Sequence, residues 1–181
     1  MIERDDPEVR IRPAVLADAS RLAELHVRSW QAGYRGLLPQ SLLDGLDPVA
    51  RLARWEAILQ DTNWPGQGTL VAEEGNELVG LARLCPERDT RLRAAGEVAA
   101  FHVAPEHWRQ GIGRRLMSAA LSRLTDAGFD IAILWVLTGN EAAIRFYETT
   151  GWRADGATKP EKSHSLKGIT VTEMRMAHSL M

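Results

Sequence analysis

The chain has 181 residues, of which 45% are hydrophobic and 25% charged, and its formal net charge at pH 7 is −2. This composition is typical of a soluble globular protein, and the length predicts one compact domain because it is too short for two ordinary domains. The charge balance argues against general nucleic-acid binding, which requires a broad basic surface, and no apolar run is long enough to cross a bilayer. We therefore expect neither nucleic acid nor a membrane as a partner.

Hydrophobic periodicity predicts an alternation of strands and helices along the chain. In order, we expect a strand at 9–12, helices at 18–34 and around 49–59, paired strands at 69–73 and 78–84, a strand at 98–103, a helix from 112 to about 127, a strand at 131–137, a helix at 141–150 and a strand at 169–176. The nearly continuous apolar run at 131–137 is typical of a strand buried on both faces of a mixed sheet. The last strand alternates and is expected to close the sheet at one edge. Asp18 and Asn140 are candidate helix caps.

The N-terminal sequence MIERDDPEVRIRP is charged and lacks the apolar segment and cleavage site of a signal peptide, which predicts a cytoplasmic protein. Cys85 is the single cysteine, so an intramolecular disulfide is excluded and a buried structural role is favoured. The five histidines form no i, i+4 pair on an expected helix, and no carboxylate completes a ligand set. We therefore expect no metal.

A glycine loop follows the strand at 98–103, within the sequence EVAAFHVAPEHWRQGIGRRL at 97–116. The order strand, loop, helix gathers unpaired backbone N–H groups at the positive end of a helix dipole, which suits a phosphate or pyrophosphate. A dinucleotide fingerprint would require glycine or alanine where Leu116 stands, and a nucleoside-triphosphate loop would require Gly-Lys-Ser/Thr at 113–115. The plain alternative is that the glycines only permit a tight turn.

Two segments resemble the GNAT N-acetyltransferase superfamily, whose members transfer an acetyl group from acetyl-CoA to an amine. PEHWRQGIG at 105–113 resembles the pyrophosphate loop Gln/Arg-x-x-Gly-x-Gly/Ala, and LWVLTGNEAAIRFYETTGW at 134–152 resembles the strand and helix that follow it. The opening RIRPAVLADASRLAELHVRSW is also similar to a GNAT first strand and helix. Trp108 departs from the pattern, because the family usually has Gln or Arg there, so any side-chain contact at that position must be reassigned.

The resemblance implies an α/β fold with a mixed, mostly antiparallel sheet, one splayed parallel strand pair and about four flanking helices. It implies a single domain at 9–178, preceded by a short tail at 1–8. The implied co-substrate is acetyl-CoA, without a metal, and the implied partner is a small-molecule or peptide amine attacked directly in a ternary complex. A non-catalytic CoA-binding regulatory module is the alternative, and both a monomer and a homodimer remain open.

The resemblance also assigns roles to individual residues. Glu97 is the candidate general base, acting through a water, because an amine with a pKa of about 10.4 must lose a proton before it attacks; the alternative is a solvated strand-end carboxylate. Tyr147 is the candidate acid for the CoA thiolate, and core packing is its alternative. Backbone N–H groups around 102–103 should stabilise the oxyanion. The expected cofactor-binding residues are Phe101, His102, Val103, Trp108, Arg109, Gln110, Gly111, Ile112, Gly113, Arg114, Asn140 and Tyr147.

The acceptor amine is expected to lie against the first helices, the loop between them and the last strands. Its candidate ligands are Trp30, Tyr34 and Arg35, with Trp55 and the segment 159–167 nearby. Trp30 and Trp55 also lie on apolar helical faces, so a core role is the alternative. Asn140 would contact the CoA arm or cap its own helix. An antibiotic, a polyamine, an amino acid and a protein N-terminus all remain open as acceptors.

Overall fold

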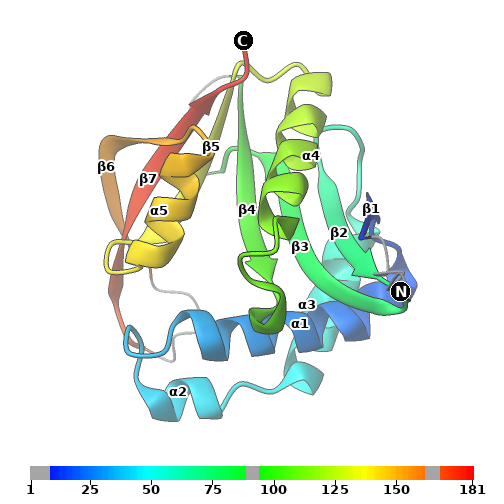
Figure 1. The fold of residues 1–181 in the computed structure, drawn as a ribbon, viewed down its shortest axis with the longest axis vertical. Helices are drawn as coiled ribbons and strands as arrows, with labels where there is room; N and C mark the ends of the chain where they lie inside the picture. The colour runs from blue at the N-terminus through cyan, green and yellow to red at the C-terminus, as the bar shows by residue number, and fades with distance from the viewer. Residues whose placement is uncertain (1–8, 89–93, 162–167) are drawn as a thin grey trace, which may run out of the picture.

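The computed structural model describes residues 9–88, 94–161 and 168–181, which form a single sheet covered by helices on both faces (Figure 1). Within these residues the strands run in the order β1-β2-β3-β4-β5-β7-β6, and every neighbouring pair is antiparallel except β4 and β5. The strands are β1 (Arg10–Pro13), β2 (Gly68–Glu74), β3 (Glu77–Pro86), β4 (Ala95–Val103), β5 (Ile131–Leu137), β6 (Arg153–Glu161) and β7 (Val171–Ser179). The predicted mixed, mostly antiparallel sheet with one parallel pair is confirmed.

Five α-helices and two short 3-10 turns complete the described fold. They are η1 (Leu16–Asp18), α1 (Ala19–Gly33), α2 (Gln40–Asp44), α3 (Pro48–Gln60), η2 (Pro105–His107), α4 (Ile112–Asp126) and α5 (Glu141–Thr149). The short helix α2 was not predicted, because Pro39 indicates a break and five residues are too few to show periodicity. No helix in the described ranges has both the length and the apolarity to span a bilayer.

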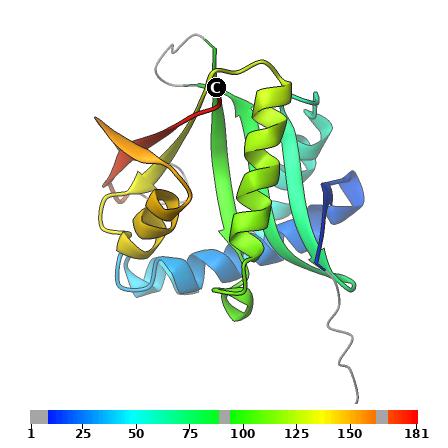
Figure 2. The same ribbon diagram turned by 45° about the horizontal axis from the view of Figure 1, so that its top comes forward.

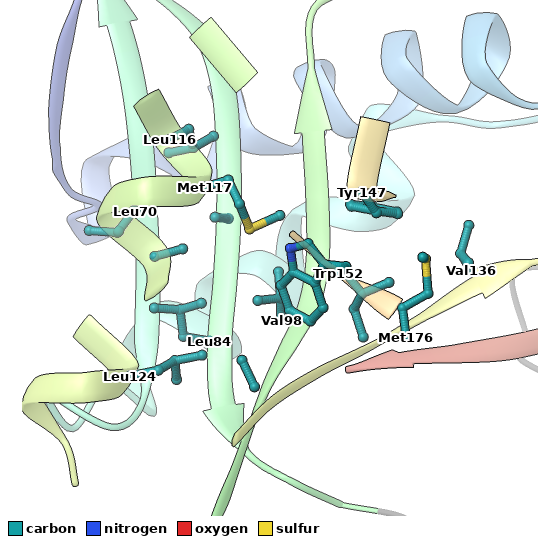
Figure 3. Packing of buried hydrophobic residues seen from close by; sticks show 14 residues of the cluster. Leu70, Leu84, Val98, Leu116, Met117, Leu124, Val136, Tyr147, Trp152 and Met176 are labelled. Atoms are coloured by element: carbon teal, nitrogen blue, oxygen red, sulfur yellow. The ribbon is translucent and has the colours of Figure 1, made fainter. Parts of the chain in front are cut away.

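Two hydrophobic clusters lie on opposite faces of the sheet. Neighbouring residues of β2 divide between them, since Leu70 packs in the cluster of α4 and α5 while Val71 packs in the cluster of α1 and α3. Figure 3 shows the first cluster, in which Tyr147 lies toward Val136 and away from Leu70. Cys85 is buried and forms no disulfide, as predicted for a structural cysteine. Both faces contribute residues to the cleft described below, which is lined from α1 and α3 on one face and from α5 on the other.

The prediction that the final strand closes the sheet was wrong. β7 lies inside the sheet, between β5 and β6, and pairs with β5 from Ile131↔Ser179 to Leu137↔Glu173. The edge strand is β6, whose sequence RADGATKPE was not predicted to be a strand. Its glycine and proline are residues typical of loops. Both are tolerated in an edge strand, because the outer side of such a strand forms no hydrogen bonds with a neighbouring strand.

Asp18 precedes α1 as expected, but its side chain does not cap that helix. The carboxylate is fully buried and accepts hydrogen bonds from Arg12 at 2.7 and 3.0 Å, from the Val15 amide at 2.8 Å and from Arg21. Arg12 also contacts Glu73 on β2 at 2.9 Å, so the network joins β1, β2 and α1. The tertiary ion pairs replaced the local cap that the sequence suggested.

The Asp18 network predicts an acid-sensitive contribution to stability. Burial alone would raise the pKa of Asp18, but hydrogen bonds from Arg12 and Val15 lower it to about 2. Because the folded pKa is depressed, the stabilisation is complete above the unfolded pKa and disappears as pH falls from about 4 to about 2, a change of about 2 kcal/mol. Asp18→Asn should lower the free energy of unfolding by about 3 kcal/mol at pH 7, measured by urea denaturation. The gap between variant and wild type should shrink at pH 3, and an equal gap at both pH values would contradict this account.

Candidate active site

The parallel strands β4 and β5 pair only at their first residues. Ala95, Gly96 and Glu97 align with Ile131, Ala132 and Ile133, after which the strands separate while β5 stays paired with β7 (Figure 2). The burial of β4 changes at the same point: its first four residues are buried and its last five are only partly covered. The second half of β4 therefore has an unpaired edge inside the molecule.

The main-chain groups at this edge follow from strand alternation. The Ala104 amide donates to the Val79 carbonyl at 2.8 Å, so this residue faces β3. Because successive residues of a strand direct their N–H and C=O groups to opposite edges, Val103 and Phe101 face the gap, whereas His102 faces β3. The Trp108 indole N–H donates to the Val103 carbonyl at 2.8 Å. Trp108, which stands where the family pattern has Gln or Arg, therefore occupies one main-chain acceptor of this edge. The amides of Val103 and Phe101 stay available as donors.

The loop after β4 places the N-terminus of α4 at the end of this gap. Gly111 has φ of +84°, which favours glycine, and nothing lies within 4 Å of the position that its Cβ would occupy. The first amide of α4 with a helical acceptor is that of Arg115, which donates to the Gly111 carbonyl. The amides of residues 112–114 therefore lie at the positive end of the helix without an intrahelical acceptor.

Gly113 allows the loop to approach α5 closely. A Cβ at this position would lie 3.2 Å from the Phe146 ring and 3.7 Å from a Val103 methyl group. The Arg115 side chain turns away and donates to the Val9 carbonyl at 2.7 Å, whereas Arg109 and Arg114 line the cleft. The loop thus combines free amides, a helix dipole and two arginines, an arrangement that suits a diphosphate.

A cleft of about 1200 Å³ extends from this loop through the β4–β5 gap to α1 and α3. The predicted residues that line it are Trp30, Tyr34, Glu97, Phe101, His102, Val103, Trp108, Arg109, Gly111, Gly113, Arg114, Asn140 and Tyr147. Three predicted residues do not line it. Gln110 donates to the Glu106 carbonyl, Ile112 is buried in a separate hydrophobic cluster, and Arg35 is exposed. Asn140 caps α5, since its side-chain oxygen accepts from the Ala143 amide at 3.2 Å.

Tyr147 is buried among aromatic rings of the α4 and α5 cluster. Its ring centroid lies 5.5 Å from Phe146, 6.2 Å from Trp152 and 6.4 Å from Phe101. Burial raises the pKa of the Tyr147 phenol, and the nearby Tyr34 raises it further. Tyr147 and Tyr34 both line the cleft. The phenol is protonated at neutral pH and can act as a hydrogen-bond donor there.

Glu97 is buried, with 1% of its surface exposed, so the reading of a solvated strand-end carboxylate is wrong. Both of its oxygens accept hydrogen bonds from Arg88, at 3.1 and 2.7 Å. Glu97 stands opposite Cys85 and Ile133, where the sheet is still closed. Phe101 lies four residues farther along β4, about 13 Å at the rise of a strand, so the Glu97 backbone is separated by about that distance from the open part of the gap.

The side of the cleft formed by α1, α3 and β3, where an acceptor amine is expected from the sequence and which is called the acceptor side below, holds a group of residues that the sequence did not reveal. Trp30 stacks on His26 with centroids 5.4 Å apart and lies 4.9 Å from Tyr34, while Trp55 is a core residue with 3% exposure. Four arginines line the same side: Arg51, Arg54, Arg83 and Arg88. They come from three separate segments, and only the i, i+3 spacing on α3 could have been noticed in the sequence.

Sequence comparisons agree on one family. The profile of the acetyltransferase (GNAT) family matches residues 22–152. An uncharacterized N-acetyltransferase of Bacillus subtilis is 30% identical over 141 residues, which cover 77% of this chain and 78% of the relative. A protein named as a probable N-acetyltransferase of Mycobacterium tuberculosis is 31% identical over 163 residues, which cover 90% of this chain and 89% of the relative.

Solved structures share the fold at lower identity. The PaiA N-acetyltransferase of Thermoplasma acidophilum in complex with coenzyme A has a TM-score of 0.71 at 18% identity, covering 95% of this chain and 99% of that one. An acetyltransferase of Salmonella typhimurium with acetyl-CoA has a TM-score of 0.69 at 23% identity, covering 96% and 95%. Together with the splayed β4–β5 pair and the family match over most of its length, these findings show that the chain belongs to the acetyltransferase (GNAT) family.

Proposed function

We propose that the protein is a single-domain N-acetyltransferase, over residues 9–178, that moves the acetyl group of acetyl-CoA to a primary amine by direct attack in a ternary complex. The observation that carries this proposal is the continuity between the unpaired edge of β4 and the N-terminus of α4. An extended ligand with amide groups can pair with the strand edge while its diphosphate meets the helix amides. Two solved structures of the same fold contain coenzyme A and acetyl-CoA, respectively, which supports the proposal.

The residues of the gap would support each step of the transfer. When the amine attacks the thioester carbonyl, negative charge develops on the oxygen, and the Val103 amide, which faces the gap, is the donor we assign to it. Collapse of the intermediate breaks the carbon–sulfur bond, forms the amide and leaves CoA as a thiolate. Tyr147 would donate a hydrogen bond to the sulfur, while the proton lost by the amine leaves through Glu97 and water.

The high pKa of Tyr147 has a specific consequence for this step. A thiol has a pKa of about 8.5, below that of a phenol with a raised pKa, so full transfer of the Tyr147 proton to the thiolate is uphill and Tyr147 would act mainly as a hydrogen-bond donor to the sulfur. Tyr147 would therefore stabilise the departing sulfur mainly in the transition state, which favours catalysis over ground-state binding.

Glu97→Gln tests the assignment of the base. If Glu97 carries the amine proton, the variant should lower kcat by about 10²-fold without changing the affinity for acetyl-CoA, measured by thiol release and calorimetry. Glu106→Gln is the matched control, because Glu106 is an exposed carboxylate paired with Arg28. Unchanged turnover in Glu97→Gln would remove Glu97 from the mechanism and leave its ion pair with Arg88 as a structural contact.

That ion pair is also the observation that favours the alternative, a non-catalytic CoA-binding module, because both carboxylate oxygens are engaged. A thiol-release screen of the full chain with acetyl-CoA and a panel of amines separates the two functions. An enzyme releases CoA in proportion to one class of amine. A binding module shows calorimetric affinity for CoA and no amine-dependent release with any member of the panel.

A further inference from the structure

The acceptor half of the cleft carries an excess of positive charge. Among the described residues, the lining of the whole cleft includes seven arginine and lysine side chains, Arg51, Arg54, Arg83, Arg88, Arg109, Arg114 and Lys159, and two carboxylates, Glu97 and Glu173. Arg109 and Arg114 belong to the loop assigned above to the diphosphate, and Lys159 lies 4.0 Å from Glu173. The acceptor half is left with four arginines and one carboxylate.

These side chains lie on one face of the sheet. Leu84 and Val98 pack in the α4 and α5 cluster, so their neighbours Arg83 and Glu97 are on the opposite face, toward α1 and α3. Ala100, the register partner of Arg83, packs against the α1 and α3 cluster. Arg51 and Arg54 reach this space from α3. The arginines therefore converge on the side from which an amine would approach the gap.

The one carboxylate of this half is already engaged. Both oxygens of Glu97 accept hydrogen bonds from Arg88, and Glu97 acts on Arg83 as a neighbouring charge that favours its protonated form. Arg54 and Arg83 form no ion pair with any carboxylate in the part of the chain that the structure describes. Arg83 is partly buried without an ion pair of its own, which costs free energy, and burial is the main cause that lowers its pKa, whereas Arg54 is exposed.

The neighbouring histidines neither add to this charge nor offset it. The rings of His26 and His102 lie 5.1 Å apart, and both residues line the cleft. Burial is the main cause that lowers their pKa values, to about 2 for His26 and about 4 for His102, so both are neutral at pH 7. The electrostatic character of this half is thus set by arginine, whose planar guanidinium matches carboxylate and phosphate groups.

We propose that the acceptor is a small primary amine that also carries a carboxylate or phosphate group, and that Arg54 and Arg83 bind this anion. This inference rests on the proposed function and specifies its substrate class. With the anion held against α3 and β3, the amine is directed toward the β4–β5 gap, since the register partner of Arg83 is one residue from Phe101. The same charges repel polyamines and other polycationic amines.

The test uses amines in matched pairs that differ in the anionic group. Thiol release from acetyl-CoA by the full chain is measured with free α-amino acids and their amides, with phosphoethanolamine and ethanolamine, and with spermidine. The anionic member of the productive pair should have a kcat/KM higher by at least ~10-fold, as expected for one charge-assisted hydrogen-bonded pair. The amino-acid and phosphate arms distinguish the two sources of the anion.

Variants then assign the effect to the arginines. Arg54→Gln and Arg83→Gln should each raise KM for the anionic amine by ~10- to 100-fold, leaving KM for acetyl-CoA unchanged and kcat at saturation within about twofold. Arg145→Gln on the exposed side of α5 is the matched control and should change neither constant. Arg54 is exposed on α3, so its variant decides the matter even if Arg83→Gln does not fold.

Each outcome has a distinct meaning. Equal or better turnover of neutral amines or spermidine would overturn the anionic acceptor while leaving the acetyltransferase intact, as would unchanged KM values in both arginine variants. CoA binding without amine-dependent release across the panel would overturn the proposed function itself, and this inference with it. An anionic preference that is lost in Arg54→Gln or Arg83→Gln and retained in Arg145→Gln supports the assignment.

Discussion

Replacing Tyr147 with phenylalanine is expected to lower kcat by about 10²-fold while the affinity for acetyl-CoA stays within about threefold of wild type. The ring contacts with Phe101, Phe146 and Trp152 survive the change, so packing and the CoA arm are undisturbed. The one lost group is a hydroxyl that the raised pKa keeps protonated. Steady-state rates with acetyl-CoA and a competent amine, together with calorimetric affinities, give both numbers.

The comparison variant is Tyr34→Phe, which removes the only other tyrosine hydroxyl of the chain. Tyr34 lines the cleft on the α1 side and is electrostatically coupled to Tyr147, so it tests whether either phenol can serve. We expect a smaller loss of kcat in Tyr34→Phe than in Tyr147→Phe. Equal turnover of Tyr147→Phe and wild type, with thermal denaturation showing both folded, would remove the acid role and leave Tyr147 as a packing residue.

The second large effect is expected at the glycine loop, where Gly111→Asp should weaken CoA binding by about 10²- to 10³-fold, the size of a repulsion between like charges a few ångströms apart near a protein surface. The new side chain enters open space, because nothing lies within 4 Å of its Cβ position. The loss therefore arises from the negative charge beside the diphosphate. Isothermal titration with CoA measures it.

Gly111→Asn is the matched control for this prediction. Asparagine has nearly the same shape as aspartate and tolerates the same positive φ, but it carries no charge. The Asn variant should bind CoA within about tenfold of wild type, since the residual cost is only the conformational strain. Equal losses in the Asp and Asn variants would show that backbone strain, not charge, determines the effect, and unchanged affinity in both would place the diphosphate elsewhere.

The sequence predicted best those elements whose signal is local. The apolar periodicity of α1, α3 and α4 and the unbroken run of β5 depend on nearby residues, and the structure has these elements within a few positions of the prediction. The glycine loop was recognised for the same reason, because strand, turn and helix follow each other directly in the chain. Asn140 was likewise predicted correctly as a cap, since a cap is a contact over three residues.

The features that sequence reasoning missed depend on distant partners. β6 is a strand because β7 pairs with it, and its polar residues with Gly156 and Pro160 carry no strand signal of their own. Asp18 was expected to cap a helix, but Arg12 binds it from β1. The ion pair between Arg88 and the buried Glu97 and the convergence of the arginines from α3, β3 and the segment after β3 arise where separate segments meet, and of these features only the i, i+3 spacing of Arg51 and Arg54 is visible along the chain.

The departure at Trp108 shows how a structure can resolve a mismatch with a family pattern. The sequence only indicated that a side-chain contact had to be reassigned. The indole N–H donates a hydrogen bond to the Val103 carbonyl at 2.8 Å, and Trp108 is 46% exposed beside the cleft. Trp108 therefore fixes the end of β4 against the loop, a contact that a glutamine or arginine could make only by giving up conformational freedom.

The central claim is that main-chain amides at the start of α4 hold the diphosphate of acetyl-CoA and that its thioester lies in the gap between β4 and β5. A crystal structure of the chain with acetyl-CoA tests it most directly. The account predicts diphosphate oxygens at hydrogen-bond distance from amides of residues 111–114, the pantetheine arm beside Val103 and Phe101, and the thioester near Tyr147. A diphosphate held by side chains away from this loop, or a thioester outside the gap, would contradict it.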